Sequence, residues 1–329
     1  MLQGSFRQNV VPGVAAFLLS LLCLIVAMNS STAAAEHASV SILQEKTGSL
    51  TIPSEYGEII YRQNEASPRH LYIIGMSHRD ALTRANRSTT PRAQAEAYKI
   101  GEWLVQKEGL NLLLPEGYFA VRSEGREAAA GHKSGSEQRM PGPSGSGMDI
   151  ATLESQLADT TRYITAEMLL SDHYHLKLRQ VEDRELYDAV YDSLRRLEQG
   201  ANNDPFLKSE LDYLQERRTA IMLQKIPELI ELEFVRGAIT SKKALLTIGL
   251  NHIPEVIKYL KEKRIAIYCP LFTSVGYGDY ISEVNLCKGD FGVTVIIPRT
   301  VMDDREVLVM TRLNELVMQR ESSFPPLIR

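Results

Sequence analysis

The chain has 329 residues, of which 44% are hydrophobic and 24% are charged, and its formal net charge at pH 7 is -4. This length is enough for one large globular domain or two ordinary ones. The mild acidity argues against a nucleic-acid-binding protein, which usually carries a clustered basic face, and no block of like charge suggests a binding tail.

Residues 1–35 have the pattern of a secretory signal. Arg7 precedes an apolar run over residues 10–28, and a small-residue exit ends near Ala35. A cleaved signal peptide is the first interpretation, with cleavage near Ala35. A retained anchor is the alternative, because the run is almost long enough to span a bilayer. Either interpretation predicts export to the periplasm or the extracellular space. Membrane contact is expected only through residues 10–28, if the segment is retained.

Two cysteines remain once Cys23 is assigned to the signal. Cys269 and Cys287 form an even pair in a chain predicted to be exported, which favours a disulfide between them. Two unpaired thiols are the alternative, because sequence spacing cannot establish the geometry that a bridge needs.

The first part of a predicted α/β domain spans residues 58–121, after a polar connector over residues 36–57. Residues 58–62 and 71–74 are apolar or aromatic runs that predict successive strands. We expect these two strands to form a hairpin around residues 64–68.

A helix is predicted next, with Thr90 as its cap, Pro91 in its first turn and Gly109 as its stop. Residues 111–114 follow as a short buried strand. A strand, a helix and a strand in this order are typical of a parallel sheet with a right-handed crossover.

Residues 122–148 are rich in Gly, Ser, Pro, Glu and Lys and almost lack large apolar side chains. Such a segment cannot bury enough surface to order itself, so it predicts a flexible insertion. A surface insertion is the simpler interpretation. A lid is the alternative, because the segment follows the carboxyl end of a strand.

A helical subdomain is predicted over residues 149–240. Its expected elements are helices over residues 149–177, 185–199 and 205–236 and a very short strand over residues 178–181. The last helix is long for a globular domain, and we expect Pro227 to kink or divide it.

The second part of the α/β domain is predicted over residues 241–329. Its expected elements are strands over residues 244–248, 265–268, 291–297 and 306–310, a helix over residues 254–263 and a short helix near the end. The fold class is therefore α/β, with a mostly parallel sheet flanked by helices and an inserted helical subdomain.

Two of the predicted strands end in the same Gly-x-x-His pattern. Gly75 precedes His78 and Gly249 precedes His252, in both cases between a strand and a helix. In open α/β sheets, ligands bind beyond the carboxyl ends of the strands, so we expect both histidines to lie there. The glycines are expected to allow a tight turn that projects each histidine over the strand end.

Acidic residues follow two further strand ends. With Glu116, the residues His78 and His252 form a suitable set of ligands for a divalent metal. Without a metal, the same set supplies a histidine base, an orienting carboxylate and a second histidine. Asp183 and Arg184 are expected on the same rim, where Arg184 could stabilise an oxyanion. As ordinary structural residues, Glu116 would cap a helix and Asp183 would pair with a neighbouring arginine.

The order of these motifs resembles that of the TraB/GumN/ChaN-like and erythromycin-esterase-like superfamily, over most of the chain from about Ile59 to Ile267. The segments that carry the resemblance are Gly75-Met76-Ser77-His78, Leu114-Pro115-Glu116, Val181-Glu182-Asp183-Arg184 and Gly249-Leu250-Asn251-His252. The resemblance implies an α/β core with an inserted helical part. Members include metal-dependent proteases, an esterase with a catalytic histidine and a haem-binding iron-uptake protein.

By position, His78 and His252 match the two Gly-x-x-His histidines of the superfamily, and Glu116 matches its acid after the second core strand. Asp183 and Arg184 match the middle polar motif. Met76-Ser77 departs from the pattern, because some members have Thr or Glu near this histidine.

We therefore expect an exported hydrolase that cleaves an amide or ester bond. His78, Glu116 and His252 would hold a divalent metal, which lowers the pKa of its bound water, or would act directly as acid and base. The absence of a Gly-x-Ser-x-Gly motif argues against an ordinary serine hydrolase.

The alternative is a haem- or metal-binding protein involved in uptake, without catalysis. His78 and His252 would then bind the ligand, and Tyr118 would form part of an apolar haem slot. The expected partner is thus a peptide, an ester or haem. A scaffold that has lost activity is the third hypothesis.

Overall fold

The computed structural model describes residues 50–78, 87–120, 147–201, 204–271 and 276–322. All the described residues belong to one compact unit. Among these residues, none of the helices has both the length and the apolar character that a bilayer span requires. The predicted signal and all but the last two residues of the predicted insertion lie outside the described residues, so both stay predictions.

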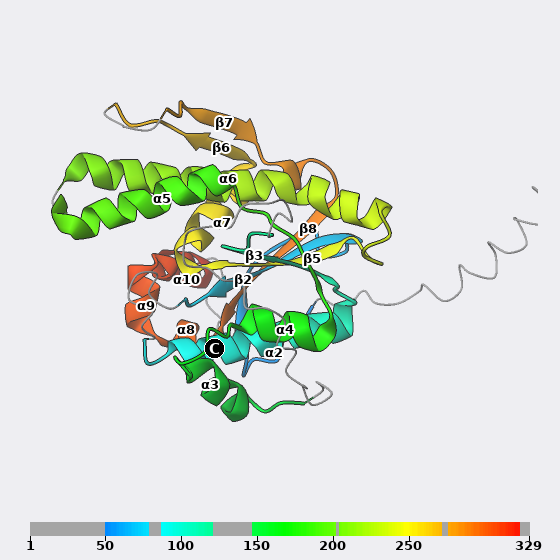
Figure 1. Ribbon diagram of the computed structural model, residues 1–329. Coiled ribbons are helices and arrows are strands. Elements are labelled where there is room, and N and C mark those ends of the chain that lie inside the picture. Colours follow the sequence, from blue (N-terminus) through cyan, green and yellow to red (C-terminus); the bar gives the residue numbers. More distant parts are fainter. Residues whose placement is uncertain (1–49, 79–86, 121–146, 202–203, 272–275, 323–329) are drawn as a thin grey trace, which may run out of the picture. The chain divides into compact units, whose positions relative to one another are not determined.

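Six strands form the central sheet, in the order β1-β8-β2-β5-β3-β4 (Figure 1). The five parallel strands are β8 (Phe291–Pro298), β2 (Arg69–Met76), β5 (Lys243–Gly249), β3 (Leu112–Pro115) and β4 (Lys177–Leu178). At the edge, β1 (Gly57–Gln63) runs antiparallel to β8. The predicted α/β class with a mostly parallel sheet is confirmed.

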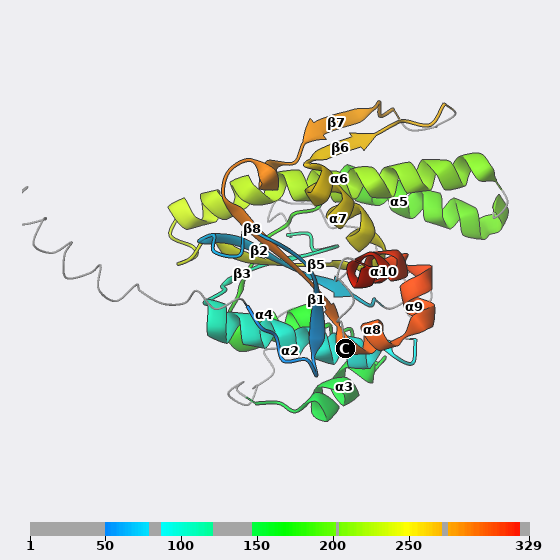
Figure 2. The same ribbon diagram turned by 180° about the vertical axis from the view of Figure 1, so that it is seen from behind.

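Helices cover both faces of this sheet (Figures 1 and 2). On one face lie α2 (Thr90–Glu108), α3 (Ile150–Ala158) and α4 (Ala166–Tyr174). On the other lie α5 (Arg184–Arg196), α6 (Pro205–Val235) and α7 (Ile253–Glu262). Above α6 in Figure 1, β6 (Arg264–Ile267) and β7 (Tyr280–Glu283) form a separate antiparallel pair. The chain ends with α8 (Arg299–Asp303), α9 (Arg305–Met310) and α10 (Leu313–Ser322).

Alternate residues of each strand enter two different cores. In β2, Leu71 and Ile73 pack with the residues of α6 and α7, whereas Tyr72 and Ile74 pack with those of α2, α3 and α4. Successive side chains of a strand point to opposite faces, so a sheet covered on both sides needs apolar residues at nearly every position. This requirement explains the unbroken apolar runs in the sequence.

The helix predicted after residues 71–74 is confirmed as α2. Its cap is Thr89, one residue earlier than expected, and Pro91 lies in the first turn. Gly109 ends the helix with φ 64, a left-handed conformation that glycine adopts without steric cost.

Two of the expected elements near the edges of the fold are wrong. The hairpin around residues 64–68 does not form, because β8 lies between β1 and β2 and pairs with both. Residues 306–310 are helical in α9 and not a strand. Asp304 caps this helix by accepting from the backbone N–H groups of Glu306 and Val307, a local signal that outweighs the short apolar run.

The region over residues 149–240 also differs in detail from its prediction. Residues 149–177 contain two helices, α3 and α4, because Asp149 and Thr165 each cap a new helix start. Helix α6 is 31 residues long and continues undivided past Pro227. These helices pack on the sheet itself, α3 and α4 on one face and α5 and α6 on the other. The strand predicted over residues 265–268 pairs with β7, which the pattern did not predict.

The two cysteines outside the predicted signal, Cys269 and Cys287, are free thiols. The Cys269 thiol donates to the carbonyl of Tyr277 at 3.0 Å, and the Cys287 thiol lies 3.8 Å from the carbonyl of Leu260. The structure thus agrees with the thiol alternative and not with the disulfide.

One histidine, His70 at the amino end of β2, is buried away from the carboxyl ends of the strands. Its Nε2 lies 2.9 Å from the Thr294 hydroxyl, and its ring stacks on Tyr72 with a centroid distance of 4.4 Å. Burial and then the charge of Lys243 lower the pKa of His70 to about 4. The ring is therefore neutral in the folded protein at neutral and mildly acidic pH.

This burial predicts a specific acid sensitivity. An unfolded histidine takes up a proton below about pH 6.5, whereas native His70 does so near pH 4, so the unfolded state binds more protons in this window. We expect the free energy of unfolding to fall by about 2–3 kcal/mol between pH 6.5 and 4 through this group alone. Urea titrations at several pH values give the free energy of unfolding. Its decrease between pH 6.5 and 4 should be larger for the wild type than for His70→Gln. An NMR titration that gives His70 an ordinary pKa would contradict the assignment.

Candidate active site

Four neighbouring strands bring polar side chains to one edge of the sheet. The strands β2, β5, β3 and β4 are adjacent and parallel, so their carboxyl ends lie side by side. The residues that follow them are, in this order, His78, His252, Glu116 and Glu182. Parallel order thus gathers residues that are far apart in the sequence, as the rule for open sheets predicts.

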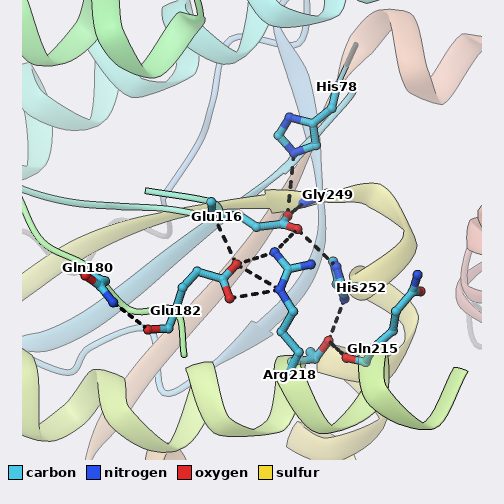
Figure 3. Close-up of polar contacts among 10 residues, drawn as sticks. His78, Glu116, Gln180, Glu182, Gln215, Arg218, Gly249 and His252 are labelled. Carbon is cyan, nitrogen blue, oxygen red and sulfur yellow. Dashed lines mark hydrogen bonds and ion pairs between the residues drawn. The ribbon is translucent and has the colours of Figure 1, made fainter. Parts of the chain in front are cut away.

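The Glu116 carboxylate is the centre of this group (Figure 3). Its Oε1 lies 2.7 Å from Arg218 Nη2 and 3.3 Å from His252 Nε2. Its Oε2 accepts from the backbone N–H of Gly249 and lies 3.7 Å from His78 Nε2. The side chain is only 12% exposed. The two predicted histidines and the predicted acid therefore converge.

A buried ion pair supports Glu116 from below. Arg218 in α6 donates through Nε to both carboxylate oxygens of Glu182, at 2.9 and 3.1 Å, and through Nη2 to both Glu182 and Glu116. The Glu182 side chain is fully buried, and its Oε1 also accepts from the backbone N–H of Gly117 at 3.2 Å. One guanidinium thus fixes the orientation of two carboxylates.

The neighbouring charges decide whether Glu116 and Arg218 are ionised. Two carboxylates and one guanidinium leave one negative charge, which a single imidazolium neutralises. Burial alone would raise the pKa of the Glu116 carboxyl, but the charges of His252 and Arg218 and the contacts with both imidazoles hold that pKa well below its usual range. Desolvation disfavours the charge of Arg218, yet Glu116 and Glu182 outweigh it and raise the pKa of the guanidinium. Glu116 is therefore a permanent carboxylate at neutral pH.

Both ring nitrogens of His252 have partners. Its Nδ1 lies 2.6 Å from the Thr219 hydroxyl, which is also 3.0 Å from the carbonyl oxygen of Gln215. Its Nε2 lies 3.3 Å from Glu116 Oε1. The imidazole is therefore held between Thr219 and Glu116.

His78 is the open member of the group. Its side chain is 43% exposed, against 9% for His252. Figure 3 shows it on the far side of the Glu116 carboxylate from Arg218. Desolvation lowers the pKa of His78, but the hydrogen bond and charge of Glu116, helped by the charge of Glu167, outweigh it and raise the pKa above its ordinary value.

The two motif glycines provide space and not the turn that we expected. Neither Gly75 nor Gly249 has a positive φ. A Cβ at Gly249 would lie 3.2 Å from Glu116 Oε2 and 3.3 Å from His78 Cδ2, so a side chain there would press on the site. A Cβ at Gly75 would collide with Ile297 and Leu250 side chains. Close approach is therefore the reason for glycine at both positions.

Three further predicted site residues lie outside the Glu116 cluster. Asp183 caps α5, where it accepts from the backbone N–H of Leu186 at 3.3 Å, and it pairs with Lys225 at 3.3 Å. Arg184 lies over the ring of Phe119, with Cζ 3.6 Å from the ring centre. Tyr118 is half-buried on the turn after β3, and its N–H donates to Pro115. The roles assigned to these three residues stay predictions.

The donor set, as folded, does not fit the metal that the resemblance implies. Both oxygens of Glu116 already accept hydrogen bonds, and the Arg218 guanidinium occupies the region from which a cation would approach Oε1. The Nε2 atom of His252 faces Glu116 Oε1 at 3.3 Å. In the described part of the chain, no three His, Cys, Asp or Glu side chains are arranged to hold a metal ion.

The contact of His78 also does not favour haem. Its Nε2 lies 3.7 Å from the ionised carboxylate of Glu116. A haem site needs an apolar slot beside its axial ligand, and burial against an ionised group costs free energy.

Glu182, Arg218 and Thr219 were missed in the sequence. Glu182 could have been found, because it directly follows an apolar residue, Val181, at a strand end and belongs to the motif that pointed to Asp183. Arg218 and Thr219 lie in the middle of a long helix, in a charged stretch that reads as a solvated face. No local pattern shows that this face turns toward the sheet.

Comparisons with known proteins add no relative. No family model, no curated protein and no solved structure matches the chain. The resemblance to the TraB/GumN/ChaN-like and erythromycin-esterase-like superfamily therefore rests on the short motifs alone.

Removal of Arg218 should destabilise the fold severely. In Arg218→Met, two buried carboxylates lose their common partner, so we expect a loss of about 3–5 kcal/mol in the free energy of unfolding. Lys225→Met is the matched control in the same helix, because Lys225 is 43% exposed and pairs with Asp183 at the surface. The control should lose less than about 1 kcal/mol in urea unfolding. Equal losses in the two variants would show that the buried contacts of Arg218 stabilise the fold no more than the surface pair does.

Proposed function

We propose that the chain is a hydrolase of ester or amide bonds in which His78 is the general base and no metal takes part. One observation carries the proposal: the exposed imidazole of His78 lies beside a buried, permanently ionised carboxylate, Glu116. Such a pair is typical of general acid–base catalysis, because the carboxylate orients the ring and stabilises its protonated form.

In the proposed mechanism, His78 takes a proton from a water molecule as the water oxygen bonds to the scissile carbonyl carbon. The ester or amide bond then breaks, and the imidazolium returns the proton to the leaving oxygen or nitrogen. Glu116 stabilises the imidazolium while it exists. His252, Arg218 and the N–H of Gly249 are positioning groups, because they hold the carboxylate in place without touching the substrate.

Replacement of His78 should abolish the activity without unfolding the protein. His78→Asn removes the base, so hydrolysis of p-nitrophenyl esters or of peptide substrates should fall by about 10²–10⁴-fold. His175→Asn is the matched control, because His175 is exposed and has a left-handed φ of 51 that asparagine tolerates. Wild-type activity in His78→Asn, with intact circular dichroism in both variants, would refute the proposed base.

The pH dependence should report the His78–Glu116 pair. A base must be unprotonated, so kcat/KM should rise with pH and level off above a midpoint higher than an ordinary histidine pKa, because Glu116 raises the pKa of His78. In Glu116→Gln the carboxylate charge is lost, so the midpoint should move about one unit toward acid, with a lower plateau. A midpoint that is the same in the variant would show that Glu116 does not raise the pKa of the base.

Chelation should leave the enzyme active. After dialysis against EDTA, esterase and peptidase activity should stay within about twofold of the untreated protein, because no step depends on a metal-bound water. Loss of activity that zinc or manganese restores would favour the metal-dependent alternative. A haem absorption band on titration, with no hydrolysis across the substrate panel, would favour the binding alternative.

A further inference from the structure

Arg184 presents a positive charge that has no acidic partner in the described part of the chain. It is exposed in the first turn of α5, and its guanidinium lies over the ring of Phe119, with Cζ 3.6 Å from the ring centre. The neighbouring Asp183 carboxylate is engaged with the Leu186 N–H and with Lys225. The N-terminus of a helix is also the end at which a cation is least favourable. An anion bound at this position would pair with the guanidinium and would reduce its unfavourable interaction with the helix dipole.

An aromatic surface connects Arg184 with the Glu116 cluster. Phe119 meets Tyr187 edge to face, with ring centres 5.0 Å apart. The Tyr187 ring in turn lies 5.2 Å from Cζ of Arg218, the arginine that holds Glu116. Both rings are only half-buried. The rings of Tyr187 and Phe119 thus lie between the buried Arg218 and the exposed guanidinium of Arg184.

Backbone connections keep this surface in a fixed place. Phe119 is three residues beyond Glu116 on the turn after β3, and Arg184 is two residues beyond Glu182 after β4. The two turns are joined directly, because the N–H of Gly117 donates to Glu182 at 3.2 Å. The position of Arg184 is therefore defined relative to the carboxylate on which His78 depends.

We infer that Arg184 is a specificity-determining residue that binds a carboxylate of the substrate, at the far end of an apolar segment that covers Tyr187 and Phe119. The inference rests on the proposed hydrolase function and names its substrate class: esters or amides whose acyl part ends in an anionic group. A guanidinium recognises a carboxylate through two parallel hydrogen bonds, and its stacking on Phe119 keeps the fork oriented.

Two esters of equal length test the preference. Mono-p-nitrophenyl adipate carries a terminal carboxylate, and p-nitrophenyl hexanoate does not. The wild type should prefer the adipate ester by about tenfold in kcat/KM, mainly through KM. Arg184→Gln should lower kcat/KM for the adipate ester much more than for the hexanoate ester and so remove this preference. Raising the salt concentration should weaken the preference of the wild type.

Arg195→Gln is the matched control, because Arg195 lies in the same helix and also stacks on an aromatic ring, that of Tyr191, at 5.9 Å. It should keep the preference for the adipate ester. Equal hydrolysis of both esters by the wild type, or an equal loss for both in Arg184→Gln, would overturn the inference and leave the proposed function standing.

Calorimetric titration with free adipate and hexanoate measures binding at the same site without hydrolysis. Binding of adipate that depends on Arg184 supports the inference even if neither ester is cleaved, a result that would count against the proposed hydrolase alone. Adipate binding that is absent, or unchanged in Arg184→Gln, would overturn the anion site.

Discussion

The buried contact of Arg218 with Glu182 and Glu116 is the interaction on which the site depends. It joins three segments: the turn after β3, the turn after β4 and the middle of α6. Taking two carboxylates out of water is unfavourable unless a partner and hydrogen bonds compensate, and here one guanidinium and the N–H groups of Gly117 and Gly249 do so. The same contact that fixes α6 on the sheet also keeps Glu116 ionised.

This arrangement explains why two similar motifs have different roles. Both histidines follow a Gly-x-x pattern at a strand end, yet His252 is held between Thr219 and Glu116, whereas His78 is exposed. The difference comes from α6, which covers the end of β5 and supplies Thr219, and which leaves His78 open. Equivalent positions in a sheet therefore give one imidazole that is held on both sides and one that is exposed.

The sequence predicted the parts of this protein that depend on local pattern. Apolar runs and caps located β2, α2, β3 and β5, and parallel strand order then placed His78, His252 and Glu116 together. Pairing between distant segments could not be predicted. The position of β8 between β1 and β2 and the contact of Arg218 with two strand ends both arise from tertiary packing, for which a single sequence carries no local signal. In α9, by contrast, the local cap at Asp304 was present in the sequence and was overlooked.

The strand order also constrains how the protein is made. Because β8 fills the position between β1 and β2, a chain that has been synthesised only as far as residue 290 has no partner for either of these strands on that side. In the same way, β2 and β3 are joined only when β5 enters between them. Contacts of such long sequence separation slow folding, and open strand edges favour aggregation in the meantime. The sheet is therefore complete only when β8 enters between β1 and β2.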